Sequence, residues 1–145
     1  MDVHNKDDER SIRRNFNRIE GGENVENMLE IKKNIYWTGI RDWEIKVFHG
    51  HELSTHRGTT YNSYLINDKK TVLVDTEWDP FKEEFAERLE REVGLDNIDL
   101  IVANHVEPDH GDALGCIMER KPDMPIYCTK NGADIIRRHF HKDWN

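Results

Sequence analysis

Apolar residues change their spacing several times along the chain, and each change predicts a different element. The run TVLVDT at 71–76 is apolar and β-branched, which favours a central strand. An apolar residue at every third or fourth position then predicts a helix over 79–94, capped by Asp79 and ended by Gly94. DLIVANH at 99–105 carries four apolar residues in a row and predicts a second buried strand.

The segments on either side extend this alternation. Before the central strand, we expect two strands around a turn in IKKNIYWTGI, a half-buried strand in DWEIKVFHG, a turn in STHRGTT and a strand in YNSYLIN. After the second buried strand, we expect a helix over 112–121, a short strand in PIYCT and a final helix over 132–140. Strands that alternate with helices in this way predict an α/β fold.

The beginning of the chain differs from the rest in composition. Residues 1–28 are mostly polar and charged, so we expect a flexible leader, although its few apolar residues also allow one short amphipathic helix. The predicted organisation is therefore this leader followed by one domain over 29–145. Translation starts at Met1 or at Met28, and the sequence leaves both open.

Charge and cysteine content narrow the class of protein. The chain has 145 residues, of which 29 are acidic and 21 basic, giving a net charge of -8. This balance argues against a nucleic-acid or membrane-surface binder, which needs clustered lysine and arginine. No apolar run approaches the length of a membrane span, and no signal peptide is present. Cys116 and Cys128 form no CxxC motif, and we expect both to be reduced thiols. We expect a soluble, cytoplasmic protein.

The run NHVEPDHGD at 104–112 concentrates potential metal ligands directly after the second buried strand. It contains His105, Glu107, Asp109 and His110. Open α/β folds place their sites at the carboxyl ends of strands, and mixed imidazole and carboxylate donors suit a first-row divalent metal. In an extended backbone the first three would point the same way, whereas the proline and glycine of the run favour a turn.

The pattern HxExDH resembles the metal motif of the metallo-β-lactamase fold, in the variant found in flavodiiron proteins. The segments RDWEIKVFHG, STHRGTTYNSYLI, TVLVDT, IVANHVEPDHGDAL and PIYCTKNGADII are similar to consecutive parts of that family, from about Ile31 to Asn145. The resemblance implies a partial αβ/βα sandwich, roughly its N-terminal half. Zinc hydrolases of this fold have histidine where this chain has Glu107, and a carboxylate there favours ferric iron and redox chemistry.

By this resemblance, the cofactor is a pair of iron ions. His105 and Glu107 would bind one ion, and Asp109 and His110 would bind the other. Asp75, near the end of the run TVLVDT, matches a position that supports the metal loop from behind, although a simple strand-end cap explains it equally well. FMN would come from a further domain that this chain lacks.

The family carries three more metal ligands, and no segment of this chain resembles them. We therefore expect an N-terminal fragment of a flavodiiron oxygen or nitric oxide reductase that supplies half of a di-iron site. The sequence leaves open whether the fragment alone is an enzyme. The alternatives are a non-catalytic oxygen-sensing or partner-binding module and a zinc hydrolase, which Glu107 disfavours.

The resemblance also implies partners. These are a second copy or a complementing chain, with rubredoxin or reduced F420 as the electron donor of the complete protein. Other histidines could line the site without binding metal. They are His49, His51, His56, His139 and His141.

Overall fold

The computed structural model describes residues 28–48 and 53–144, so the predicted leader lies outside it except for Met28. The strands are β1 (Leu29–Lys32), β2 (Ile35–Trp37), β3 (Ile40–Asp42), β4 (Val47–Phe48), β5 (Leu53–Ser54), β6 (Thr59–Tyr61), β7 (Tyr64–Asn67), β8 (Thr71–Val74), β9 (Leu100–Val102) and β10 (Ile126–Tyr127). The helices are η1 (Asp79–Phe81), α2 (Lys82–Glu92), η2 (Leu95–Asn97), α3 (Pro108–Gly111), α4 (Ala113–Arg120) and α5 (Lys130–Phe140).

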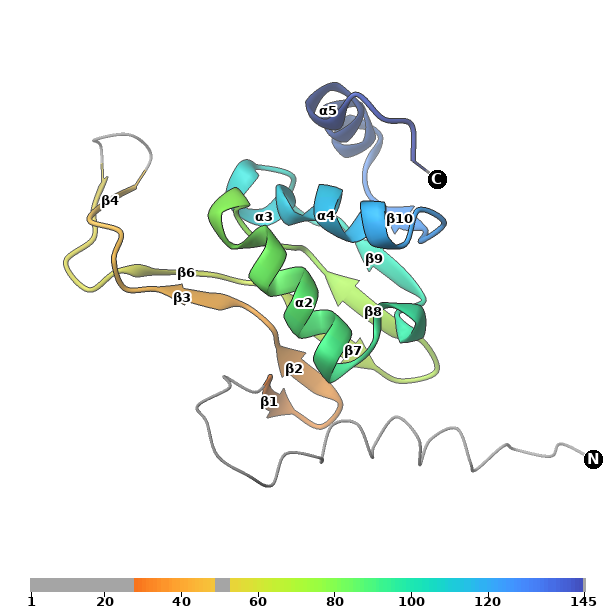
Figure 1. Cartoon of the computed structure of the whole chain (residues 1–145), viewed down its shortest axis with the longest axis horizontal. Helices are drawn as coiled ribbons and strands as arrows, with labels where there is room; N and C mark the ends of the chain where they lie inside the picture. The colour runs from red at the N-terminus through yellow and green to blue at the C-terminus, as the bar shows by residue number, and fades with distance from the viewer. Residues whose placement is uncertain (1–27, 49–52, 145) are drawn as a thin grey trace, which may run out of the picture.

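The largest sheet of the described residues has the strand order β1-β2-β7-β8-β9-β10 (Figure 1). Strands β1, β2, β7 and β8 pair antiparallel, whereas β8, β9 and β10 pair parallel. The two parallel connections each contain a helix, as the alternation of the sequence predicted. The α/β fold and the central position of TVLVDT are therefore confirmed.

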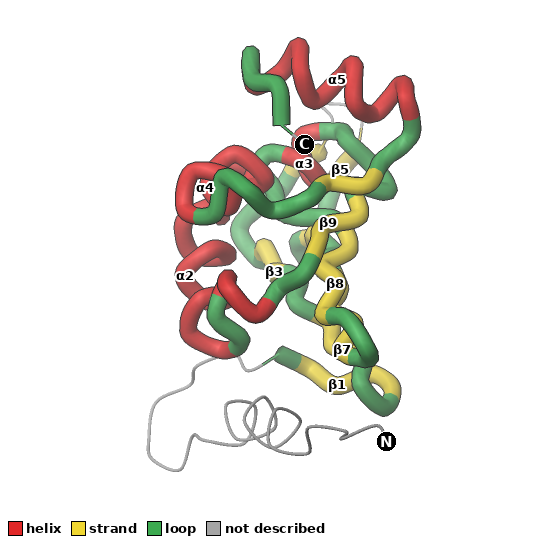
Figure 2. Tube along the Cα trace, turned by 90° about the vertical axis from the view of Figure 1, so that its right-hand side faces the viewer, coloured by secondary structure: helices red, strands yellow, loops and turns green. Residues whose placement is uncertain are grey.

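Helices α2 and α4 lie together on one face of this sheet (Figure 2). The apolar spacing that predicted them is the spacing of their buried faces. Gly94 ends the first helical segment with a φ of 81°, a conformation that glycine adopts without strain. The core between the helices and the sheet contains Leu65, Leu73, Phe85, Leu89, Val93, Ile98, Ile101, Leu114, Ile117, Met118 and Met124.

The opposite face of the sheet is also apolar, but its side chains are only half-buried. Because side chains alternate along a strand, each fully buried residue that faces α2 and α4 is flanked by residues on the other face. None of the described helices covers this second face (Figure 2). A sheet with both faces apolar and one face covered has the form of half a sandwich. The half-buried residues are Tyr64, Ile66, Val72, Val74, Leu100 and Val102.

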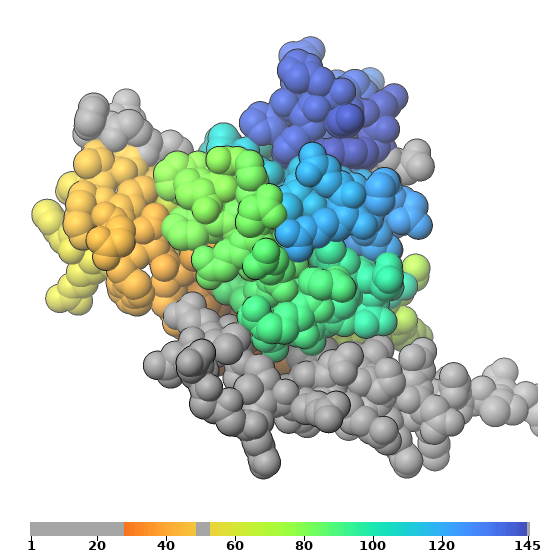
Figure 3. Space-filling view, in the orientation of Figure 1, coloured from red at the N-terminus to blue at the C-terminus, as the bar shows by residue number. Residues whose placement is uncertain are grey.

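Strands β3 to β6 form an arm that projects from the sheet (Figure 1 and Figure 3). The predicted half-buried strand in DWEIKVFHG is wrong over 43–46, which belong to no strand between β3 and β4, and Trp43 is 61% exposed. The Asp42 carboxylate accepts hydrogen bonds from the backbone N–H groups of Glu44 and Ile45, both at 3.0 Å. This side-chain turn competes with strand pairing.

Two helix starts also differ from the prediction. Trp78 stands at the N-cap before Asp79, and the Asp79 carboxylate contacts Lys82 at 2.6 Å instead of capping the backbone. The last helix begins at Lys130, two residues before the predicted start. Thr129 caps it, since the Thr129 hydroxyl accepts a hydrogen bond from the N–H of Gly132 at 3.0 Å.

Replacing Thr129 by alanine should therefore destabilise the protein modestly. The first turn of α5 loses its side-chain acceptor, which costs about 1 kcal/mol of unfolding free energy. Urea denaturation followed by circular dichroism measures the change. Thr129→Ser keeps the hydroxyl and is the matched control, so equal losses in both variants would contradict a capping role.

Candidate metal centre

The candidate metal loop follows β9, and Asp75, the residue expected to support this loop, follows β8. These two strands are parallel, with Val74 paired to Val102, so both end at the same edge of the sheet. The residues after β8 therefore meet the loop 104–112, although about 30 positions separate them in the sequence. Every predicted site residue lies at this edge.

The four candidate ligands form two pairs of neighbouring donors. His105 Nε2 lies 3.2 Å from Glu107 Oε2, and His110 Nε2 lies 3.4 Å from Asp109 Oδ2. The rings of His105 and His110 approach edge to face, with centroids 5.1 Å apart. The family resemblance assigns these same two pairs to two iron ions, and that assignment stays a prediction.

These distances fit two ligands on one ion. Donors each about 2.1 Å from a metal, in tetrahedral or octahedral arrangement, lie about 3.0 to 3.4 Å apart. Charge-assisted hydrogen bonds are shorter, at about 2.7 to 2.9 Å. Each pair supplies two donors only, and within 28–48 and 53–144 no three His, Cys, Asp or Glu side chains gather around one point. The residues present therefore fit half of a two-ion site.

The backbone of the loop explains why the donors form pairs. Glu107 is extended, with φ −67° and ψ 156°, and its carboxylate lies beside the His105 imidazole. Helix α3 begins at Pro108, which suits a first helical position. The chain therefore turns after Glu107, as its proline and glycine favoured, and Asp109 lies beside its neighbour His110.

Asp75 holds the start of the loop. Its Oδ1 accepts hydrogen bonds from the backbone N–H groups of Asn104 and His105, at 2.7 and 2.9 Å. The side chain is nearly buried, and the residue has a φ of 57°, a left-handed conformation that aspartate tolerates better than most residues. Asp75 thus contacts the backbone of a candidate ligand, as a supporting residue would.

Sequence reasoning missed the two residues that follow. The Thr76 backbone N–H and side-chain hydroxyl both donate to the carbonyl of His110, at 2.8 and 2.9 Å. The Glu77 carbonyl accepts from the N–H of Ala113 at 2.8 Å, at the start of α4. No sequence signal marks either residue, because both partners lie more than 30 positions away.

Glu77 is also a buried acid. Its side chain is 0% exposed; Oε1 accepts a hydrogen bond from the Ser63 hydroxyl at 2.8 Å, and Oε2 finds no partner among the described residues. Burial raises the pKa of Glu77 to about 8, and the nearby charge of Asp109 also raises it, against the opposing effects of Ser63 and Arg88. Glu77 therefore keeps its proton at neutral pH.

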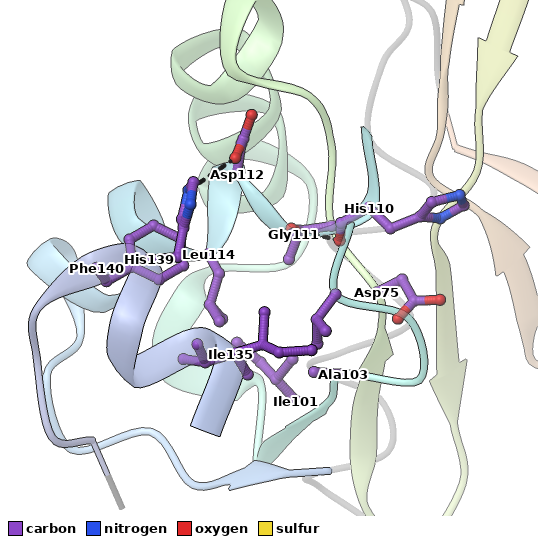
Figure 4. Close-up of a pocket in the computed structure, with 13 residues that line it drawn as sticks. Asp75, Ile101, Ala103, His110, Gly111, Asp112, Leu114, Ile135, His139 and Phe140 are labelled. Carbon is purple, nitrogen blue, oxygen red and sulfur yellow. Dashed lines mark hydrogen bonds and ion pairs between the residues drawn. The ribbon is translucent and has the colours of Figure 1, made fainter. Parts of the chain in front are cut away.

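Among the described residues, the other histidines form no ion pair with the four candidate ligands. His139 contacts Asp112 at 3.0 Å beside a small hollow between α5 and the loop (Figure 4). The His110 imidazole points away from this hollow (Figure 4). His56 and His141 are exposed, and His49 and His51 lie outside the described residues.

Solved structures with the same fold were found among oxygen-reducing and related proteins. The flavodiiron protein from Giardia intestinalis matches with a TM-score of 0.72 and 30% identity, over 85% of this chain and 29% of that one. The rubredoxin oxygen:oxidoreductase from Desulfovibrio gigas matches with a TM-score of 0.73 and 34% identity, over 81% and 29%. No protein-family model matches the chain.

Curated proteins with similar sequences carry names related to those of the solved structures. An anaerobic nitric oxide reductase flavorubredoxin from Vibrio vulnificus is 48% identical over 118 residues, which is 81% of this chain and 24% of the relative. A flavorubredoxin homolog from Escherichia coli O157:H7 is 51% identical over 118 residues, which is 29% of its length.

The sheet with helices on one face, and its neighbours among solved structures, define an α/β domain of the metallo-β-lactamase-like class. Within this class, the chain belongs to the flavodiiron family, whose N-terminal portion it matches. It spans about a quarter of the length of the curated relatives that it matches. Among the described residues, no helix has the length and apolar character needed to cross a membrane.

Proposed function

We propose that this chain supplies half of the di-iron site of a flavodiiron oxygen or nitric oxide reductase. His105 and Glu107 would hold one iron, and Asp109 and His110 the other, with Asp75 supporting the loop. The observation that carries the proposal is the spacing of the two donor pairs, 3.2 and 3.4 Å. Iron bound there would supply one-electron redox chemistry towards oxygen or nitric oxide.

The chain's own residues set the character of such a site. Glu107 and Asp109 place two carboxylates beside two imidazoles, a donor set that favours a higher oxidation state over a set of imidazoles alone. His105 and Glu107 are about half-exposed, at 49% and 59%, whereas Asp109 and His110 are 19% and 28% exposed. The first pair is therefore the more accessible one to a small molecule or a covering chain.

The half-buried sheet face and the two-donor pairs support a further part of the proposal. A second copy or a complementing chain would cover that face and complete the ligands, and FMN with a rubredoxin or F420 donor would supply electrons. We propose the leader over 1–28 and the domain over 29–145 as the organisation. The unpaired cysteines Cys116 and Cys128 support a cytoplasmic location.

An anaerobic titration with Fe²⁺ tests the function. We expect about two ions per chain, bound weakly because each has two protein ligands, and little oxygen uptake compared with a full-length flavodiiron protein. Glu107→Ala and Asp109→Ala should each remove one ion, whereas Asp123→Ala, at an exposed position after α4, should remove none. A single zinc ion with hydrolase turnover, or ions that persist in both variants, would overturn the proposal.

A further inference from the structure

We propose that Thr76 is a positioning residue for the Asp109–His110 half of the metal site. The inference rests on the proposed function, because it concerns how the chain prepares these two side chains for an ion. It adds a role that the sequence motif does not contain, since Thr76 lies outside HxExDH.

The contacts of Thr76 converge on one atom. Its backbone N–H and its side-chain hydroxyl donate to the same carbonyl, that of His110, at 2.8 and 2.9 Å. Thr76 is 2% exposed, so water does not compete effectively for these hydrogen bonds. A carbonyl oxygen has two lone pairs, and Thr76 occupies both.

His110 needs such an anchor because the second nitrogen of its ring, Nδ1, has none. Its Nδ1 is buried and finds no hydrogen-bond partner among the described residues. A metal-bound histidine is usually oriented by a hydrogen bond from the ring nitrogen that does not touch the ion. Apart from its contacts with His105 and Asp109, the ring is positioned through the backbone of His110, and Thr76 contacts that backbone.

The two halves of the site are held by consecutive residues. Asp75 accepts from the N–H of His105 at 2.9 Å, beside the His105–Glu107 pair. Thr76 donates to His110, beside the other pair. A change at Thr76 should therefore affect one half of the site and spare the other.

A titration with Zn²⁺ alone, followed through the imidazole nitrogen resonances of each histidine, tests this separation. Thr76→Val has nearly the same shape but loses the hydroxyl donor. We expect Zn²⁺ affinity measured at His110 to fall about 3- to 10-fold, with the value at His105 changed less than about 2-fold. Thr76→Ser restores the donor and should restore the affinity at His110.

Each other outcome has a distinct meaning. Equal affinities in wild type and Thr76→Val would overturn the role of Thr76 while leaving the metal site intact. An equal loss at His105 and His110 would also overturn it, because Thr76 would then support the fold in general. No response of either histidine in the wild type would reject the metal site itself. If Thr76→Val fails to fold, Thr76→Ser against Thr76→Ala gives the same contrast.

Discussion

Replacing Asp75 by alanine should lower the free energy of unfolding by about 3 kcal/mol. The substitution leaves two backbone N–H groups, those of Asn104 and His105, without the acceptor that they have now at 2.7 and 2.9 Å. A buried donor without a partner costs about 1 to 3 kcal/mol. Alanine also tolerates the φ of 57° less well than aspartate does.

Asparagine at the same position is the matched variant. Its side-chain oxygen can accept both hydrogen bonds, and asparagine adopts left-handed conformations readily, so Asp75→Asn should cost less than about 1 kcal/mol. Asp99→Ala provides a second reference, because Asp99 accepts one backbone hydrogen bond, from Thr71 at 2.7 Å, at the opposite end of the sheet. Urea denaturation of the three variants measures the differences. Equal stabilities for Asp75→Ala and Asp75→Asn would show that Asp75 does not hold the loop.

The candidate ligands could be predicted because they are close in sequence. His105, Glu107, Asp109 and His110 occupy six consecutive positions after a strand whose apolar run is unmistakable, so both the cluster and its place at the sheet edge follow from local pattern. Their division into two pairs depends on where the backbone turns. Pro108 signalled that turn, but the pattern alone did not decide between an extended and a helical loop.

Thr76 and Glu77, unlike Asp75, could not be predicted from the sequence. Glu77 stands between Thr76 and Trp78 in a polar stretch that reads as an exposed approach to a helix. Its burial depends on Ser63, which lies between β6 and β7, and on the parallel alignment of β8 with β9. Such contacts arise from topology, and a single sequence carries no local signal for them.

In the arm, a side-chain turn at Asp42 forms where the apolar alternation predicts a strand. Trp43, Ile45 and Val47 alternate with polar residues as in a strand. The N–H groups of Glu44 and Ile45, however, donate to the Asp42 carboxylate and not to a neighbouring strand. Burial of Tyr61 against the same Asp42 raises the pKa of the phenol, and Tyr61 donates to Asp42 at 3.2 Å. Asp42 thus organises the arm through three hydrogen bonds that hydrophobic patterning does not represent.

Stability should fall as pH rises from about 4.5 to about 8, because Glu77 is buried. In the folded protein its pKa is about 8, against an ordinary value of 4.5. Between these values the folded state holds a proton that the unfolded chain releases, so each increase in pH favours unfolding. The loss is at most about 5 kcal/mol over this range, at about 1.4 kcal/mol for each pH unit.

Glu77→Gln should remove most of that dependence, because glutamine cannot ionise. Below pH 5 we expect the wild type to be the more stable, since the amide places two N–H donors where the protonated acid places one O–H, at an atom without a partner among the described residues. Near pH 8 the order should reverse, because the wild type must then bury a charge or retain its proton. Glu84→Gln, at an exposed position on α2, should follow the wild-type slope. Unfolding free energies at several pH values measure all three proteins, and parallel curves for wild type and Glu77→Gln would exclude a buried, protonated Glu77.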